Sequence, residues 1–335
     1  MRKKKDLLLF VLVSGIAFLI CCAAPHEKLP VPVIFDTDIA PDYDDVGALA
    51  MLHALADNGE AEILATMSSN AFPTTVPVLS VINTYFNRPG LPVGVVKTGT
   101  PSYDCPRKWA DTIIARYPHS LASNEEAMDA VHLYRRILSS QPDTSVTIIT
   151  VGYLTNLANL LDSGPDEYSR LGGTDLVQKK VKRLVAMAGA IDSSGRGGYE
   201  ANILADISAS QKVFAGWPTE IILSGHEIGA RLFTGMKLIA NKDILDSPVK
   251  DAYRVAIDWD GTTTGRYSWD QTAVLVGVRG TDPFFETGKL DARISVDGRM
   301  DVIAGDRITY LLANQRTAEL PEIIEDLMMQ EPEYK

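Results

Sequence analysis

The sequence has little cysteine, few aromatic residues and a deficit of positive charge. Its 335 residues include 3 cysteines, 7 % aromatic residues, and 32 lysines and arginines against 43 aspartates and glutamates. Three cysteines are too few for a disulfide scaffold. A formal net charge of -11 argues against a nucleic-acid partner, because phosphates are bound by clustered Lys and Arg. With 46 % hydrophobic and 22 % charged residues, the chain is not disordered and has the composition of a globular protein.

Long apolar runs are absent after residue 24, but the chain begins with one. A cluster of Lys and Arg precedes the 18-residue run Leu7–Ala24, which is typical of a signal peptide. We predict a signal peptide over residues 1–22, a spacer over 23–30, and therefore export to the periplasm. Cys21 and Cys22 resemble the lipid-attachment site of bacterial lipoproteins, so a membrane-anchored lipoprotein and a freely exported protein are both open. The run is also just long enough for a retained anchor helix, and we expect no other contact with a membrane.

The body of the chain alternates apolar, strand-like runs with segments of helical periodicity. We expect strands at Val31–Asp38, Glu62–Asn70, Pro92–Lys97, Ser145–Val151, Arg183–Ala188 and Glu220–Leu223. We expect helices at Asp45–Ala56, Val76–Phe86, Thr155–Leu161 and Ser208–Ala215. This alternation predicts an α/β fold with an open, mostly parallel sheet and helices on both faces. No linker or internal repeat divides the sequence, so we expect one domain over residues 31–335.

Three further segments carry more local signals. Ser123 and Glu126 have the spacing of a capping box, which predicts a long helix over residues 123–139. Short extended pieces around an Asp-Gly pair predict an antiparallel hairpin within residues 283–301, a small antiparallel extension near the C-terminus. The pattern of residues 317–329 predicts a terminal helix.

The strongest chemical signal is an acidic run between the first strand and the first helix. Residues 36–45 contain five aspartates, at positions 36, 38, 42, 44 and 45. In an open α/β sheet this is the edge where ligands bind. Five carboxylates brought together repel one another unless protons or a cation intervene. Because hard oxygen ligands suit Ca²⁺ or Mg²⁺, the run predicts a metal site, whereas capping and a polar turn would explain only one or two of the aspartates.

This run resembles the N-terminal signature of the inosine–uridine-type nucleoside hydrolase family, in the variant written DTDxGNDxDD. Ala40 and Pro41 stand where that variant has Gly-Asn. Four more places resemble the family, in its order: Asn70 after the second strand, Thr150–Ala158 (like TGPLTNLA), Glu200–Asp206 (like EFNIxxDP), and Trp269-Asp270 in place of a His-Asp pair. Each motif is weak alone, but five in order across residues 31–280 identify the chain as a member of the family.

The resemblance implies a fold, an activity and a set of site residues. Members hydrolyse the N-glycosidic bond of ribonucleosides to ribose and free base, with a bound Ca²⁺ and water as the attacking nucleophile. The implied metal ligands are the carboxylates of Asp38, Asp45 and Asp270 and the backbone carbonyl of Val151. Asp38 is also the implied general base.

The resemblance also implies how the ribose is held. Asp44 and Asn70 would bind the 2′- and 3′-hydroxyls, and Glu200 and Asn202 the 5′-hydroxyl side. Oligomers are common in the family, so a homo-oligomer is open.

Activation of the leaving base is where this chain departs from the family. Many members use the His of the His-Asp pair to help the base leave, but Trp269 stands here and cannot donate a catalytic proton. Trp269 would instead stack on the base or form a wall of the pocket. His226 is the nearest candidate acid by position, although a structural or surface histidine is the commoner role. Arg266, Tyr267 and Tyr199 are further candidate pocket residues.

Three alternatives are weighed against this interpretation. A phosphatase of the haloacid dehalogenase type also begins with a strand ending in Asp-x-Asp, but leaves Asn70, Asn202 and Asp270 unexplained. A non-catalytic nucleoside- or ribose-binding protein on the same fold is suggested by Trp269. A hydrolase acting on another ribosyl substrate is open because the ribose-binding motifs match better than the base-binding ones, and the sequence does not separate purine, pyrimidine or nicotinamide ribosides.

Overall fold

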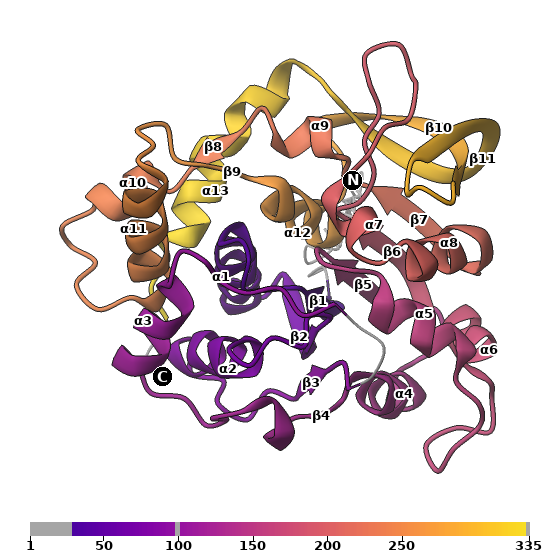
Figure 1. Ribbon diagram of the computed structural model, residues 1–335, viewed down its shortest axis with the longest axis horizontal. Helices are drawn as coiled ribbons and strands as arrows, with labels where there is room; N and C mark the ends of the chain where they lie inside the picture. Colours follow the sequence, from indigo (N-terminus) through magenta and orange to yellow (C-terminus); the bar gives the residue numbers. More distant parts are fainter. Residues whose placement is uncertain (1–28, 98–100, 333–335) are drawn as a thin grey trace, which may run out of the picture.

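The apolar segment predicted as a strand at Val31–Asp38 does form a strand, which lies inside a mixed sheet. The computed structural model describes residues 29–97 and 101–332, so the predicted signal peptide and most of the spacer lie outside the described residues. Within the described residues the large sheet has nine strands in the order β10-β11-β7-β6-β5-β1-β2-β3-β4 (Figure 1). These strands are β1 (Val31–Thr37), β2 (Ala61–Ser68), β3 (Val93–Val95), β4 (Met128–Asp129), β5 (Val146–Thr150), β6 (Val181–Ala186), β7 (Glu220–Leu223), β10 (Phe285–Ile294) and β11 (Met300–Ala313).

Within the described part of the large sheet, the outer strands β10 and β11 pair antiparallel, and all the other neighbouring strands pair parallel. The predicted hairpin near the C-terminus is therefore confirmed, and its second strand continues to Ala313. A separate two-stranded antiparallel ribbon joins β8 (Phe233–Thr234) to β9 (Arg266–Tyr267). The predicted α/β fold with a mostly parallel sheet is confirmed.

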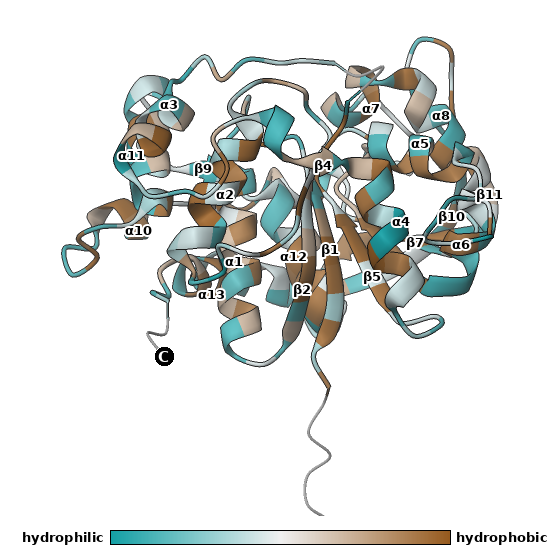
Figure 2. Ribbon diagram, turned by 90° about the horizontal axis from the view of Figure 1, so that it is seen from below, coloured by the Kyte–Doolittle hydropathy of each residue, from teal (hydrophilic) through white to brown (hydrophobic). Residues whose placement is uncertain are grey.

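Helices cover both faces of the sheet, and the strands between them are strongly apolar (Figure 2). The helices on the first face are α1 (Asp44–Asp57), α2 (Thr75–Tyr85), α3 (Trp109–Arg116), α11 (Pro248–Asp260), α12 (Trp269–Arg279) and α13 (Leu320–Met328). Those on the second face are α4 (Ala130–Ser140), α5 (Thr155–Asp162), α6 (Gly173–Lys180), α7 (Ala201–Ala205) and α8 (Ile207–Gly216). Two short helices, α9 (His226–Gly229) and α10 (Met236–Ala240), and two 3-10 turns, η1 (Asn124–Glu126) and η2 (Gln315–Glu319), complete the elements of the described residues. Burial between these two apolar layers is the main stabilising contribution to the fold.

The predicted helix over residues 123–139 begins seven residues later than expected. Ser123 makes no capping hydrogen bond to the turn that follows it, and residues 124–126 form only the turn η1. Asp129 is the true N-cap, because its carboxylate accepts hydrogen bonds from the backbone of Val131 and His132. The segment before it pairs with β3 as the edge strand β4, a tertiary contact that overrides the local capping signal.

The predicted terminal helix over residues 317–329 is divided in the same way. Asn314 caps the turn η2 in a capping box with Thr317, and α13 then begins at Leu320, with Pro321 in its first turn. Proline is well accommodated in that turn, where its missing N–H has no helical partner to lose.

The register of the central strands brings the sequence motifs to one edge. Asp36 on β1 is level with Thr150 on β5, and Thr37 is level with Ser68 on β2. The residues that follow these three parallel strands therefore emerge together at the carboxyl edge, the upper edge in Figure 2. This edge is where an open parallel sheet forms its ligand site.

Candidate functional site

The acidic run turns from β1 into α1 at the carboxyl edge of the sheet. Asp44 and Asp45 form the first turn of α1, whose N-cap residue, Tyr43, makes no side-chain capping bond. Carboxylates in this position interact favourably with the positive end of the helix dipole. The Thr37 hydroxyl donates a hydrogen bond to Asp45 and also accepts one from the Ile39 N–H at 3.1 Å, which holds the turn.

A second helix brings another carboxylate to the same point. Asp270 lies in the first turn of α12, and α12 packs along α1. One carboxylate oxygen from each of Asp44, Asp45 and Asp270 lies within 4.8 Å of the others, and the three side chains belong to residues that are buried. Two helix N-termini thus converge on one small, oxygen-lined volume.

Burial and mutual repulsion raise the pKa values of this set. Burial, followed by the charge of Asp42, raises the pKa of Asp38 to about 8. Burial and the charges of Asp38 and Asp44 raise the pKa of Asp45 well above its usual value. The pKa of Asp270 is raised well above its usual value by burial and by the same neighbouring carboxylates. A bound cation would remove this repulsion, so the donor chemistry and the crowding both fit a hard divalent metal.

Asp38 and Val151 border the pocket in front of these carboxylates. The Tyr153 hydroxyl donates a hydrogen bond to Asp38, a contact that the sequence did not reveal. The Val151 carbonyl accepts a hydrogen bond at 3.1 Å from the Asn202 side chain. A carbonyl oxygen has two lone pairs, so this bond orients Val151 and leaves one lone pair for a metal.

Glu200 and Asn202 form the opposite wall, at the start of α7. The Glu200 carboxylate accepts hydrogen bonds from the backbone N–H groups of Gly189, Asn202 and Ile203 at 2.8 to 3.2 Å. Burial nevertheless raises the pKa of Glu200 to about 7. Much of the hydrogen-bonding capacity of Glu200 is therefore already used in shaping this wall.

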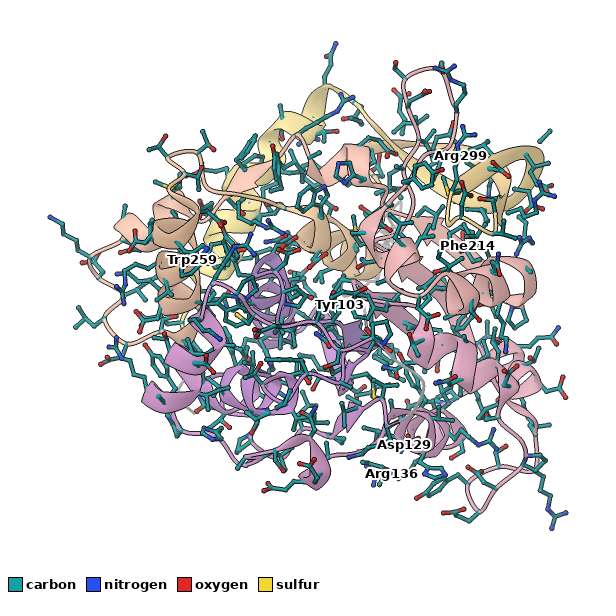
Figure 3. All side chains as sticks on the ribbon, in the orientation of Figure 1. Tyr103, Asp129, Arg136, Phe214, Trp259 and Arg299 are labelled. Carbon is teal, nitrogen blue, oxygen red and sulfur yellow. The ribbon has the colours of Figure 1, made fainter. Side chains whose placement is uncertain are left out.

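Asn70 follows β2 as predicted but does not border the pocket. Its side chain is bonded at both ends to the backbone of Tyr103, at 3.0 Å each, and donates to the Asp38 carbonyl at 3.1 Å. Tyr103, near the middle of Figure 3, also packs edge-on against Tyr153 at 5.5 Å. Asn70 thus fastens the segment around Tyr103 beside Asp38.

The remaining wall is aromatic and cationic. Trp269 and His226 both border the pocket and stack with ring centroids 5.1 Å apart. Burial lowers the pKa of His226 from its usual value, which favours the neutral imidazole. The Arg266 guanidinium lies over the Trp269 ring and pairs with Asp44 at 2.9 Å and with Asp42 at 2.8 Å.

The structure also separates the less specific sequence candidates. Arg266 borders the pocket, whereas Tyr199 bonds Asp297 on the surface. Tyr267 lies beside Trp269 and is partly exposed. The pocket lining also includes Asp42, named above only as part of the acidic run, Ala201, named only within the Glu200–Asp206 motif, and Met187, which had no signal in the sequence.

The fold agrees with comparisons to known proteins. The sequence profile described as "Inosine-uridine preferring nucleoside hydrolase" matches residues 33–318. This chain belongs to that family. As a member, it is 32 % identical over 224 residues to a pyrimidine-specific ribonucleoside hydrolase RihA from Salmonella schwarzengrund, in a match covering 60 % of this chain and 61 % of that relative. The chain thus spans about three fifths of the length of the curated relatives it matches.

Solved structures show the same fold for this family member. A purine-preferring ribonucleoside hydrolase from Gardnerella vaginalis superposes with a TM-score of 0.67 at 19 % identity, covering 89 % of this chain and 99 % of that one. An inosine-uridine preferring nucleoside hydrolase from Bacillus anthracis superposes with a TM-score of 0.66 at 16 % identity, with the same coverage. At these identities the likeness concerns the fold alone.

Proposed function

We propose that this protein hydrolyses the N-glycosidic bond of ribonucleosides in a calcium-dependent reaction, releasing ribose and free base. The observation that carries the proposal is the set of buried, mutually repelling carboxylates at the head of a pocket with an aromatic wall. The family membership and the curated relative's activity support the same reaction.

Four groups would hold the metal: the carboxylates of Asp38, Asp45 and Asp270 and the carbonyl of Val151. Asp44, whose carboxylate has an oxygen within 4.8 Å of oxygens of Asp45 and Asp270, would accept hydrogen bonds from the ribose hydroxyls or add an oxygen to this set. When bound, Ca²⁺ would supply positive charge that fixes hydroxyl ligands and makes water more acidic.

The protein groups then divide the remaining work. Asp38 would accept the proton of the attacking water as general base, and its hydrogen bond from Tyr153 would hold it in position. The carboxylate set would also stabilise the positive charge that develops on the ribose ring as the bond to the base breaks. Glu200 and Asn202 would hold the 5′-hydroxyl side of the ribose.

Departure of the base would depend on the aromatic wall. Trp269 and His226 border the pocket together, so His226 is within reach of a base that contacts Trp269. We propose His226 as the group that hydrogen-bonds the leaving base. Its lowered pKa means that a proton it carries would be given up readily.

The decisive experiment is ribose release from inosine, adenosine, guanosine, uridine, cytidine and nicotinamide riboside, each with Ca²⁺ and with excess chelator. We expect release that disappears with chelator and in Asp38→Asn, and the ranking would identify the base. Nucleoside binding with no release from any substrate would favour the non-catalytic binding protein. Release that is insensitive to chelator would overturn the metal dependence.

We also propose that the protein is exported. The apolar run after a basic start supports this. As a separate observation, none of the helices within residues 29–97 and 101–332 is long and apolar enough to span a bilayer. Mass spectrometry of the mature N-terminus would distinguish a lipid-modified cysteine from a freely released chain, and an intact Met1 would overturn cleavage.

A further inference from the structure

Four aromatic side chains form a continuous surface that begins in the pocket and leads out of it. We call His226, Trp269, Tyr267 and Phe233 the aromatic ridge. Successive ring centroids along it are 5.1, 4.7 and 4.6 Å apart. The first two residues border the pocket, whereas Tyr267 and Phe233 lie beyond it and are 37 % and 39 % exposed. Figure 1 shows β8, β9 and α9 grouped next to the start of α12.

The outer part of the ridge is held by backbone pairing. Phe233 and Tyr267 are cross-strand partners in the ribbon of β8 and β9. Because side chains alternate along a strand, Tyr267 faces outward while its neighbour Arg266 reaches Asp44. The same ribbon therefore places a cation at the carboxylates and an aromatic ring on the surface.

The inner part of the ridge is fixed as firmly. The Trp269 indole N–H donates to the His226 carbonyl at 2.9 Å. Helix α9 approaches Trp269 so closely that a Cβ at Gly229 would lie 2.3 Å from the Trp269 Cα, so this contact needs glycine. The Ser268 N–H donates to the Leu232 carbonyl at 2.9 Å, which joins the two halves of the ridge.

We propose that the aromatic ridge extends the base-binding part of the pocket and takes a second planar group attached to the base of the substrate. This inference rests on the proposed function, because it assigns the base side of the same site. A single base in contact with the pocket-lining pair leaves Tyr267 and Phe233 outside the pocket. A base with a linked aromatic ring would place that ring against them, and aromatic stacking of this kind is a substantial contribution to binding.

The size and position of the ridge favour a substrate over a protein partner. A stable protein interface buries about 800 Å² on each side, far more than two side chains at this exposure provide. The ridge is also continuous with the pocket through Trp269, as an extended subsite requires.

The test compares two ribosides that differ in the second group only, 6-benzylthiopurine riboside and 6-methylthiopurine riboside. We expect the wild-type kcat/KM to favour the benzyl compound by about five- to tenfold, chiefly through KM. Phe233→Ala and Tyr267→Ala should each bring this ratio toward one. The matched control is Trp259→Ala, an exposed aromatic on α11 that is outside both the ridge and the pocket lining, labelled at the left of Figure 3, which should leave activity and ratio unchanged.

The alternatives give distinct results. A wild-type ratio near one, or a ratio that both variants keep, would overturn the ridge as a subsite while leaving ribonucleoside hydrolysis intact. If neither compound releases ribose, the ratio of their dissociation constants by calorimetry decides the ridge, and ribose release from the six nucleosides above decides the proposed function. A dimer in light scattering that Phe233→Ala abolishes, with the ratio unchanged, would assign the ridge to a second copy and overturn the proposal.

Discussion

Two buried aspartates of the acidic run, Asp36 and Asp38, are two residues apart and have opposite surroundings. Asp36 accepts a hydrogen bond from the Tyr134 hydroxyl at 2.8 Å, and the Asn156 amide donates to both of its oxygens at 3.1 Å. Asp38 borders the pocket, receives one hydroxyl from Tyr153, and faces the charges of Asp42 and Asp44. Burial raises the pKa of both carboxyls, of Asp36 to about 7 and of Asp38 to about 8.

The difference lies in what offsets the cost of burial. Around Asp36 the protein supplies the donors itself, so this carboxyl joins β1, α4 and α5 in the core. Around Asp38 and its neighbours the nearest charges are mostly other carboxylates, so protons or a cation from outside must offset their repulsion. One short motif therefore contains a residue that builds the fold and residues that build the site.

The largest expected effect comes from removing one carboxylate of the cluster. Asp270→Asn should lower ribose release at least about a thousandfold, because it weakens both the metal site and the charge opposite the ribose. It should also raise the thermal midpoint of the metal-free protein, since one source of repulsion is lost. Release kinetics and thermal unfolding, each with chelator and with Ca²⁺, measure the two effects.

The control for Asp270→Asn is the response to metal. In wild type, Ca²⁺ should raise the thermal midpoint, because a ligand that binds only the folded state stabilises it. A variant that still gains the same increase and retains activity would remove Asp270 from the metal site.

Replacing Asp36 should have the opposite effect, a large loss of stability with little change in activity. Asp36→Ala leaves the Tyr134 hydroxyl and the Asn156 amide buried without their acceptor, which should cost about 3 kcal/mol of unfolding free energy. Activity per folded molecule should stay within about threefold of wild type, because Asp36 is outside the pocket. Urea unfolding and active-site titration separate the two quantities.

Tyr134→Phe is the matched, milder change on the same network. It removes one donor to Asp36 and should cost about 1 kcal/mol, without changing the metal response. Loss of turnover in either variant at full folding would mean that Asp36 takes part in the reaction, and the contrast with Asp38 would fail.

The sequence predicted the strands that carry the motifs because these strands are mostly apolar and β-branched. The strand at Glu220–Leu223 was predicted with its correct bounds, and the first strand within one residue. The sequence did not predict the edge strand β4, because its two residues are defined by pairing with β3 and not by their own hydrophobic pattern.

The site was predictable as a set of carboxylates but not as a set of contacts. Asp44, Asp45 and Asp270 were identified from the sequence, and the structure brings their carboxylates together. The pairing of Arg266 with Asp44 joins residues 222 positions apart, and no local pattern indicates it. Likewise, the bonds between the Asn70 side chain and the backbone of Tyr103 join residues 33 positions apart, and no pattern in the sequence indicated them.

The smallest expected effect is a pH dependence that distinguishes the two regions. The pKa values of Asp36, Asp38, Asp45 and Asp270 are all raised in the folded protein. The folded state therefore holds more protons than the unfolded state above pH 4, and stability must fall as the pH rises toward 8. Metal-free protein should unfold at least about 3 °C lower at pH 8 than at pH 5, measured by calorimetry with chelator.

Calcium should reduce the difference between the thermal midpoints at pH 5 and pH 8, and it should do so only through the carboxylates at the pocket. Ca²⁺ lowers the pKa values of the carboxylates it contacts, whereas Asp36 is enclosed by its own donors and keeps its share of the pH dependence. The thermal midpoint of Asp270→Asn should therefore change less with pH than that of wild type when metal is absent. The thermal midpoint of Asp36→Ala should change less with pH than that of wild type when Ca²⁺ is bound. Equal slopes in wild type and both variants would show that neither region controls the stability of the protein between pH 5 and 8.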